Sequence, residues 1–330
     1  MKMLSKTMSF LMVFMLATVL TLFTPLDAEP ATGARPPSEI TIIMVPKALD
    51  NPIFLDAKVA AEAKAAELGI KFEFVGPVRS DAAEQVSVME GLVERRVDGI
   101  IVSVNDAEAL RDVINRAVDA GIMVATFDSD SIDSKRSFYV GTHNYNIGYE
   151  SGKRMLEHLP DGGNLAILTG RLGMANHEAR IQGFMDAIEG SKINVLPIQS
   201  GEADVLRSVE VINQFTAANP DLDAWWFTGG WPLNADPQAM PELKRFHDNG
   251  GVVVSLDSAY PMLRFLEEEY LDELLGQNFV LMGSLGVETL YKLIQGENVD
   301  LGDEDNQIDT GYELVDKDNW EAVKATKSPY

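Results

Sequence analysis

The sequence predicts an α/β protein in which two doubly wound parallel sheets, each covered by helices on both faces, form two lobes. From Ile40 onward, short apolar runs alternate with segments of helical period. Runs such as 98–104 are apolar at successive positions, which is typical of strands buried on both faces of a parallel sheet. The alternation pauses near residue 140 and then starts again, so we expect the Rossmann-like unit to occur twice.

The first series contains four predicted strands and three predicted helices. The strands are 40–45, 71–75, 98–104 and 122–127, and the helices are 52–68, 82–96 and 106–120. A polar loop, 128–137, and a short run, 138–140, close the series. Helix start and stop signals lie where this assignment needs them: Asp81 with Glu84, Asp106, Gly69 and Gly121.

The second series repeats the pattern with longer intervals. Its helices are 146–159, 176–189 and 204–218, and its strands are 164–169, 193–198, 224–228 and 251–256, with a helical segment between the last two strands. Trp225 and Trp226 lie inside an apolar strand and are expected in the core.

Composition limits the classes of function. A chain of 330 residues has room for two lobes of ordinary size. Its net charge of −24 and isoelectric point near 4.4 would repel nucleic acid and anionic membranes, so neither is expected as a partner. Because there is no cysteine, disulfides, thiolate metal sites and cysteine nucleophiles are excluded.

The N-terminus predicts export. Lys2 and Lys6 precede an apolar run, 10–23, that is short for a span of about 20 residues. A small-residue cleavage pattern ends at Ala28, so we interpret 1–28 as a signal peptide cleaved near Ala28, and 29–38 as a flexible lead-in. An uncleaved anchor is the alternative.

Several catalytic motifs are missing. The glycine patterns of dinucleotide and P-loop sites do not occur, and the segment after the first strand, 47–52, contains no glycine. Two acidic stretches, 128–133 and 300–305, lack the calcium-loop pattern and are expected to be solvated loops. Four histidines without metal-ligand spacing are expected at the surface or in packing: His143, His158, His177 and His247. No cofactor or metal is predicted.

Polar and aromatic side chains follow the predicted strands, where open α/β sheets bind ligands. The candidate ligand-binding residues are Asn51, Phe54, Ser103, Asp128, Ser129, Asn176, Arg180, Trp231, Asp257 and Gln277. This mixture suits a neutral polyhydroxyl ligand, because carboxylates accept from a hydroxyl, arginine donates to it, and amides do either. Simpler roles remain open: a helix cap for Asn51, core packing for Phe54, and loop or cap positions for Asp128 and Asp257.

Six motifs in order resemble one known family. They are DNPIF at 50–54, DGIIVSVNDAEAL at 98–110, TFDS at 126–129, NHEARIQGF at 176–184, VVSLDS at 253–258, and GQNF with GVETL across 276–290. Over roughly 39–316 the chain resembles the periplasmic sugar-binding proteins of the ribose-binding type, the type I periplasmic binding proteins that serve ABC sugar importers.

The resemblance implies a domain plan and partners. It implies an N-terminal lobe of 39–142 plus 278–309, a C-terminal lobe of 143–277 plus 310–330, and a three-crossover hinge between them. A monosaccharide or polyol would lie between the lobes of a monomer, and a membrane permease would recognise the closed form. The family's aromatic and amide fall on Asn51, Ile53 and Phe54, and its carboxylates, arginine and hinge glutamine fall on Asp128, Asp257, Arg180 and Gln277.

Departures from the ribose pattern put ribose itself in doubt. Ile53 stands where relatives have a second aromatic, Ser129 stands where they have an arginine, and Ala203 replaces a phenylalanine. An expected Asn-Asp pair is Gly229-Gly230, and Trp231 is the replacement stacking surface that we expect.

Three other functions share this fold. A periplasmic sensor subunit, which presents sugar to a kinase or chemoreceptor, stays open as an alternative. A LacI-type regulator core would require a basic DNA-binding surface, which the net charge of −24 disfavours. An enzyme on this fold would reveal itself by product formation from a candidate sugar.

Overall fold

The structure, a computed structural model, describes residues 35–329. The predicted signal peptide, 1–28, and most of the predicted lead-in lie outside the described residues. From Arg35 the chain is anchored, because the Arg35 N–H donates to Gln295 Oε1 at 2.9 Å. A short 3-10 turn, Pro37–Glu39, then leads into the first strand.

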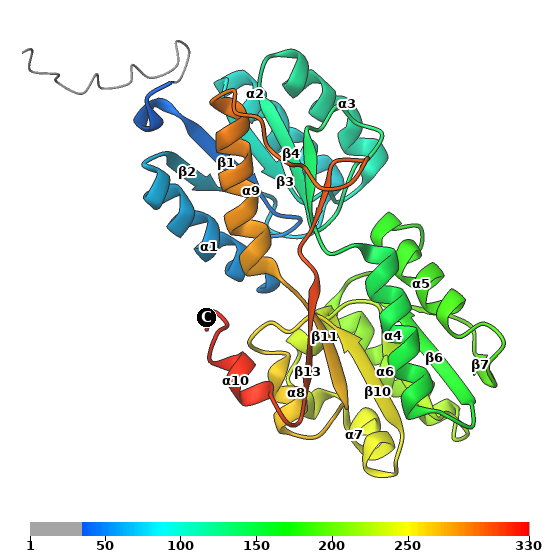
Figure 1. Ribbon diagram of the computed structural model, residues 1–330. Coiled ribbons are helices and arrows are strands. Elements are labelled where there is room, and N and C mark those ends of the chain that lie inside the picture. Colours follow the sequence, from blue (N-terminus) through cyan, green and yellow to red (C-terminus); the bar gives the residue numbers. More distant parts are fainter. Residues whose placement is uncertain (1–34, 330) are drawn as a thin grey trace, which may run out of the picture. The chain divides into compact units, whose positions relative to one another are not determined.

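The first lobe, here the N-lobe, is built on a six-stranded parallel sheet with the order β12-β5-β4-β3-β1-β2 (Figure 1). The strands are β1 (Thr41–Val45), β2 (Lys71–Phe74), β3 (Gly99–Val102), β4 (Met123–Phe127), β5 (Phe138–Gly141) and β12 (Gln307–Asp309). The helices are α1 (Ile53–Leu68), α2 (Ala82–Arg95), α3 (Ala107–Asp119) and α9 (Phe279–Ile294).

The second lobe, here the C-lobe, has a seven-stranded sheet with the order β13-β11-β10-β9-β6-β7, in which β8 also pairs with β6. The strands are β6 (Gly163–Thr169), β7 (Ile193–Val195), β8 (Gln199–Ser200), β9 (Ala224–Phe227), β10 (Val252–Leu256), β11 (Glu273–Gln277) and β13 (Tyr312–Asp316). The helices are α4 (Asn144–His158), α5 (Ala175–Ala187), α6 (Val205–Ala218), α7 (Pro241–Asp248), α8 (Leu263–Glu267) and α10 (Trp320–Lys324), with 3-10 turns η2 (Trp231–Asn234) and η3 (Pro237–Ala239). Only β13 runs antiparallel to its neighbour among the described strands.

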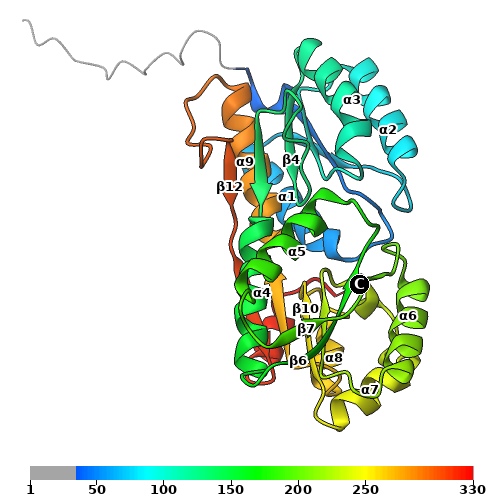
Figure 2. The ribbon, with the colours of Figure 1, turned by 90° about the vertical axis from the view of Figure 1, so that its right-hand side faces the viewer.

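Each sheet is buried on both faces, which confirms the predicted doubly wound fold. Ile42 and Met44 pack in the cluster that includes α1 and α9, whereas Ile43 and Val45 pack with α2 and α3. This alternation follows from the two-residue period of a strand. In the C-lobe, β6 and β10 lie between α4 on one side and α6 and α7 on the other (Figure 2).

The predicted tryptophan core is confirmed. Trp225 and Trp226 are fully buried on opposite faces of β9. The Trp226 ring stacks on Phe184 of α5 with centroids 4.1 Å apart. Burial of two such rings contributes several kcal/mol to the lobe, at roughly 25 cal/mol per Å² of apolar surface.

The prediction of one strand over 193–198 is wrong. The chain forms β7 and then, after a break, the separate short strand β8. Pro197 lies in the break, and because proline has no N–H it cannot donate to the ladder. Apolar character alone did not reveal this interruption.

The chain passes between the two sheets three times (Figure 1). It leaves β5 for α4 through 142–143, leaves β11 for α9 through Asn278, and leaves β12 for β13 through 310–311. The first and third passages are joined, because Thr142 Oγ1 donates to the Gly311 carbonyl at 3.0 Å and the Thr310 N–H donates to the Gly141 carbonyl at 3.0 Å.

Candidate functional site

Two buried aspartates occupy equivalent places in the two lobes. Asp128 directly follows β4 and Asp257 directly follows β10, and both are less than a tenth exposed. Their φ angles are 58° and 71°, in the left-handed region that non-glycine residues seldom adopt. Such conformations cluster at functional sites, because the surrounding structure must hold them there.

In the N-lobe, Asp128 is held by a hydroxyl and an ammonium group. Ser103 Oγ donates to Asp128 Oδ2 at 2.6 Å, and Lys47 Nζ lies 3.3 Å from the same oxygen. The Lys47 side chain is only 12% exposed. A buried carboxylate therefore has a largely buried cation beside it, which offsets the desolvation cost of both charges.

Lys47 connects the two lobes electrostatically. Burial lowers the pKa of Lys47, Asp128 and Asp257 raise it, and Arg180 lowers it further. The field at the Lys47 ammonium group therefore includes contributions from charged residues of both lobes. Our sequence analysis missed Lys47; the signal available was its position just beyond β1, at a carboxyl end of the sheet.

In the C-lobe, Arg180 of α5 is almost fully buried. Its Nη1 donates to the Thr228 carbonyl at 2.9 Å, and its Nε donates to Asn144 Oδ1 at 2.8 Å. Its Nη2 is buried and has no hydrogen-bond partner in the structure. Asn176, one turn earlier on the same helix, is also buried.

Asp257 is held by neutral donors. Asp257 Oδ2 accepts from the Gly230 N–H at 2.8 Å, and Oδ1 accepts from Gln277 Nε2 at 2.7 Å. The other end of this amide, Gln277 Oε1, is buried without a partner. Buried polar atoms are normally satisfied, so an unpaired donor on Arg180 and an unpaired acceptor on Gln277 point to a ligand that can both accept and donate. A hydroxyl group does both.

Trp231 and His177 pack together beside this group. The two rings meet edge to face with centroids 5.2 Å apart, and Trp231 Nε1 donates to Ser208 Oγ at 2.7 Å. His177 is buried and its Nδ1 lies 2.8 Å from Thr228 Oγ1. Burial lowers the pKa of His177 well below its usual range, and Arg180 and Lys47 lower it further, so this ring is neutral. The packing role expected for His177 is confirmed, but its proximity to these cations was not foreseen.

The remaining candidates in the N-lobe have local contacts. Phe54 is buried, and its ring meets Phe127 and Phe279 edge to face at centroid distances of 5.9 and 5.7 Å. Asn51 Oδ1 accepts from the Ile53 N–H at 3.2 Å, at the start of α1. These contacts fit the packing and capping alternatives. Ser129 is buried directly after Asp128. Ligand roles for these three residues stay predictions.

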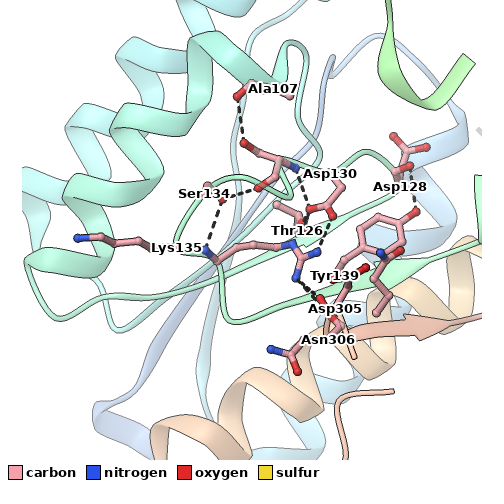
Figure 3. A network of polar contacts seen from close by, with 12 residues as sticks. Ala107, Thr126, Asp128, Asp130, Ser134, Lys135, Tyr139, Asp305 and Asn306 are labelled. Atoms are coloured by element: carbon pink, nitrogen blue, oxygen red, sulfur yellow. Dashed lines mark hydrogen bonds and ion pairs between the residues drawn. The ribbon is translucent and has the colours of Figure 1, made fainter. Parts of the chain in front are cut away.

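The description of 128–133 as a solvated loop is wrong for its central residues (Figure 3). Asp130 forms a two-point ion pair with Arg136, at 2.6 Å to Nε and 2.7 Å to Nη2. Arg136 Nη1 also donates to the Asp305 carbonyl at 3.0 Å. The Asp130 carboxylate is therefore balanced by a guanidinium group. Within 35–329, no group of three or more His, Cys, Asp or Glu side chains could hold a metal ion.

A cavity of about 330 Å³ lies between residues of the two lobes, near the first passage. Its N-lobe wall includes Glu108 and Arg111, and its C-lobe wall includes His143, Asn144 and Asn176. Of the predicted site residues, Asn176 therefore faces a space shared by both lobes.

No helix within the described residues is long and apolar enough to cross a membrane.

Fold and site together define a two-lobed binding protein with a polar, charge-balanced region at its strand ends. The model of the periplasmic binding protein domain matches residues 42–298. The chain therefore belongs to this family, in its type I, ribose-binding branch of sugar-binding proteins.

Individual relatives agree with this assignment. The ribose import binding protein RbsB of Bacillus subtilis is 25% identical over 84% of this chain and 91% of its own length. The D-ribose/D-allose-binding protein of Pseudomonas aeruginosa is 25% identical over 89% and 93%. An ABC transporter solute-binding protein from Burkholderia graminis, solved in complex with D-arabinose, is 32% identical, with a TM-score of 0.79 over 86% of this chain and 98% of that one.

Proposed function

We propose that this protein is the solute-binding receptor of an ABC importer, which binds a monosaccharide or polyol between its lobes and presents it to a membrane permease. The observation that carries the proposal is the position of four charged residues: Lys47 lies 3.3 Å from Asp128 in the N-lobe, and Arg180 and Asp257 are buried in the C-lobe. Two of these residues come from each lobe, so a ligand placed among them would touch both lobes at once. The three relatives above, with their named sugars, support the same class of ligand.

The charges favour a neutral ligand. Lys47 and Arg180 balance Asp128 and Asp257 in number, so a sugar acid or an amine would leave one charge uncompensated in a buried place. Neutral hydroxyls can instead bond to the unpaired Arg180 Nη2 and Gln277 Oε1. Hydrogen bonds to charged groups contribute on the order of 1.5–3 kcal/mol each.

The proposed mechanism is binding without chemical change. Contact with both lobes favours a closed arrangement over an open one, so the ligand shifts a two-state equilibrium about the hinge. Closure of two domains around a ligand is a general motion of periplasmic binding proteins. The proposed lobes are 39–142 plus 278–309 and 143–277 plus 310–330. The mature protein is proposed to be exported to the periplasm as a monomer.

A thermal-shift screen tests the proposal. D-arabinose, D-ribose, D-allose and a panel of polyols would be added to the mature protein, with D-glucuronate as the charged control. A ligand that binds only the folded state stabilises it and so raises the melting temperature. At a free ligand concentration of a hundred times Kd, the stabilisation is about 2.7 kcal/mol. We expect a neutral sugar to raise it and glucuronate not to.

Two variants locate the site. Asp128→Ala and Asp257→Ala should each abolish the shift while still melting cooperatively. If both folded variants keep the full shift, the ligand binds elsewhere, and if a sugar is converted to product, the protein is an enzyme.

A further inference from the structure

We propose that Tyr139 and Asn144 form a relay across the first passage between the lobes, which joins the placement of Asp128 to the placement of Arg180. The inference rests on the proposed function, because it assigns positioning roles for the same site. Neither residue was a candidate in the sequence analysis. The relay would make the lobe arrangement and the geometry of the two ligand-binding charges depend on each other.

Tyr139 begins the relay in the N-lobe. It lies on β5, is 2% exposed, and its hydroxyl lies 3.3 Å from the Asp128 carbonyl and 3.1 Å from the Thr142 carbonyl. Figure 3 shows the Tyr139 hydroxyl directed at Asp128. One carbonyl belongs to a site residue and the other to the passage between the lobes. The hydroxyl therefore connects the backbone at Asp128 with the first passage between the lobes, 142–143.

Gly141 makes room for this hydroxyl. A Cβ atom on Gly141 would lie 2.2 Å from the Tyr139 hydroxyl oxygen, which is far inside van der Waals contact. Residues two apart on a strand share one face, so any side chain at 141 would compete for the place of the hydroxyl. A glycine at this position thus serves Tyr139 and not a turn.

Asn144 continues the relay in the C-lobe. It is the first residue of α4, and its Oδ1 accepts from Arg180 Nε at 2.8 Å. Asn144 lies two residues after Thr142, whose carbonyl lies 3.1 Å from the Tyr139 hydroxyl. The first passage between the lobes therefore holds the contact with Tyr139 at one end and the contact with Arg180 at the other.

The loop after Asp128, residues 129–137, is tied to another part of the chain by Arg136. Arg136 pairs with Asp130 and donates to the carbonyls of Asp305 and Asn306, just before β12 begins (Figure 3). The chain is therefore held at Asp130, two residues after the Asp128 carbonyl. A rotation at 142–143 would be transmitted to the Asp128 carbonyl and to Arg180 together.

The absence of cysteine allows a direct test. Ala83→Cys on α2 and Ala218→Cys on α6 place spin labels at exposed positions in the two lobes, and pulsed EPR gives the distance distribution between them. We expect Tyr139→Phe and Gly141→Ala to broaden or shift this distribution in the ligand-free protein. Tyr145→Phe is the matched control, because its hydroxyl bonds Asp186 Oδ2 at 2.9 Å, within the C-lobe.

Affinity for D-arabinose, measured by calorimetry, supplies the second readout. Tyr139→Phe and Asn144→Ala should each weaken binding about five- to tenfold, and the double variant should be no weaker than the worse single variant, because both act through one connection. If the double variant instead loses affinity by the product of the two single losses, Tyr139 and Asn144 act independently and the relay is wrong. A merely structural role would lower the melting temperature and leave both Kd and the distribution unchanged.

Different results would contradict the relay and the proposed function. If D-arabinose leaves the parent distribution unchanged, the choice of ligand is wrong, but the ligand-free comparison still decides the relay. Identical ligand-free distributions in the parent, Tyr139→Phe and Tyr145→Phe proteins would overturn it. Tyr139→Phe keeps the ring, so it provides the test even if Gly141→Ala does not fold.

Discussion

Asp128 and Asp257 share a place in the fold and a left-handed backbone, yet the two lobes hold them differently. The N-lobe places a cation, Lys47, and a hydroxyl, Ser103, beside Asp128. The C-lobe gives Asp257 only neutral donors, the Gly230 N–H and the Gln277 amide. The same strand-end geometry can therefore bury a carboxylate as an ion pair or as a hydrogen-bonded anion.

The C-lobe keeps an ionic cluster at the opposite end of its sheet. Glu273, the first residue of β11, accepts from Arg154 Nε at 2.8 Å and lies 3.2 Å from His158 Nε2. This cluster fixes α4 on the sheet and lies away from the strand ends that carry the site. The N-lobe thus pairs its site carboxylate with a cation, whereas the C-lobe pairs Glu273 with cations in its scaffold and leaves Asp257 to neutral donors.

The largest effect should come from Lys47→Met. The substitution keeps the length of the side chain but leaves Asp128 buried without its cation, which should lower the free energy of unfolding by about 3 kcal/mol at pH 7. Urea denaturation of the ligand-free protein measures the loss. The double variant Lys47→Met/Asp128→Asn is the control, because without either charge part of the stability should return. A single variant as stable as the parent would show that the pair contributes nothing.

Glu273→Gln probes the scaffold cluster and should come next. Burial would raise the pKa of Glu273, but the hydrogen bonds from Arg154 and the His158 ring 3.2 Å away lower it to about 2. A lowered carboxyl pKa stabilises the fold above the unfolded value near 4.5, and this contribution is lost as pH falls towards 2. We expect a loss of about 2 kcal/mol at neutral pH, after allowance for the partial exposure of Arg154.

The pH profile of that loss is the sharper measurement. The Glu273 carboxylate, 3.2 Å from His158 Nε2, raises the pKa of His158, so His158 stabilises the fold at low pH and this contribution is lost as pH rises through its folded pKa. The stability difference between the parent and Glu273→Gln should therefore peak between about pH 4.5 and 6.5, where Glu273 is ionised and His158 is protonated in both states. Urea titrations at pH 3.5, 5.5 and 8 measure it, and a difference that does not change with pH would contradict this account.

The fold was largely predictable, because its signals are local. Apolar runs and helix caps placed most elements within two residues of their bounds, and the Asp81 side chain does accept from the Glu84 N–H at 2.9 Å. The wrong prediction of one strand over 193–198 also has a local cause, Pro197. A proline interrupts a strand only where its N–H would have been needed for a hydrogen bond to the neighbouring strand. The three passages between sheets depend on contacts distant in sequence and came only from the resemblance.

The site was predictable in part. The positions of the strand ends predicted Asp128, Arg180 and Asp257. The hydrogen-bond and ion-pair partners of these side chains come from other elements, and the spacing of residues in the sequence does not reveal them. Lys47 looked like an ordinary loop lysine, and Tyr139 like an ordinary strand tyrosine. Conversely, Phe54 looked like a wall of the site, and its visible contacts are with core rings.

The smallest effect should be that of Asp257→Asn, and its contrast with Asp128→Asn tests the comparison of the lobes. Asparagine tolerates the left-handed backbone and can still accept from the Gly230 N–H. Its amide nitrogen would then face Gln277, whose unpaired Oε1 can turn to accept from it. We expect a loss below about 1 kcal/mol in the ligand-free protein, against about 2 kcal/mol for Asp128→Asn, which leaves Lys47 without its carboxylate.

The two asparagine variants should also differ in their response to pH. Burial lowers the pKa of Lys47, so the unfolded chain binds more protons than the folded one between the folded pKa and about 10.5, and stability rises with pH across that window. Asp128→Asn removes a charge that raises the pKa of Lys47, so the window should widen towards neutral pH in this variant more than in Asp257→Asn. Urea denaturation at pH 7 and pH 9.5 measures this, and equal pH responses would mean that both lobes hold their aspartate in the same way.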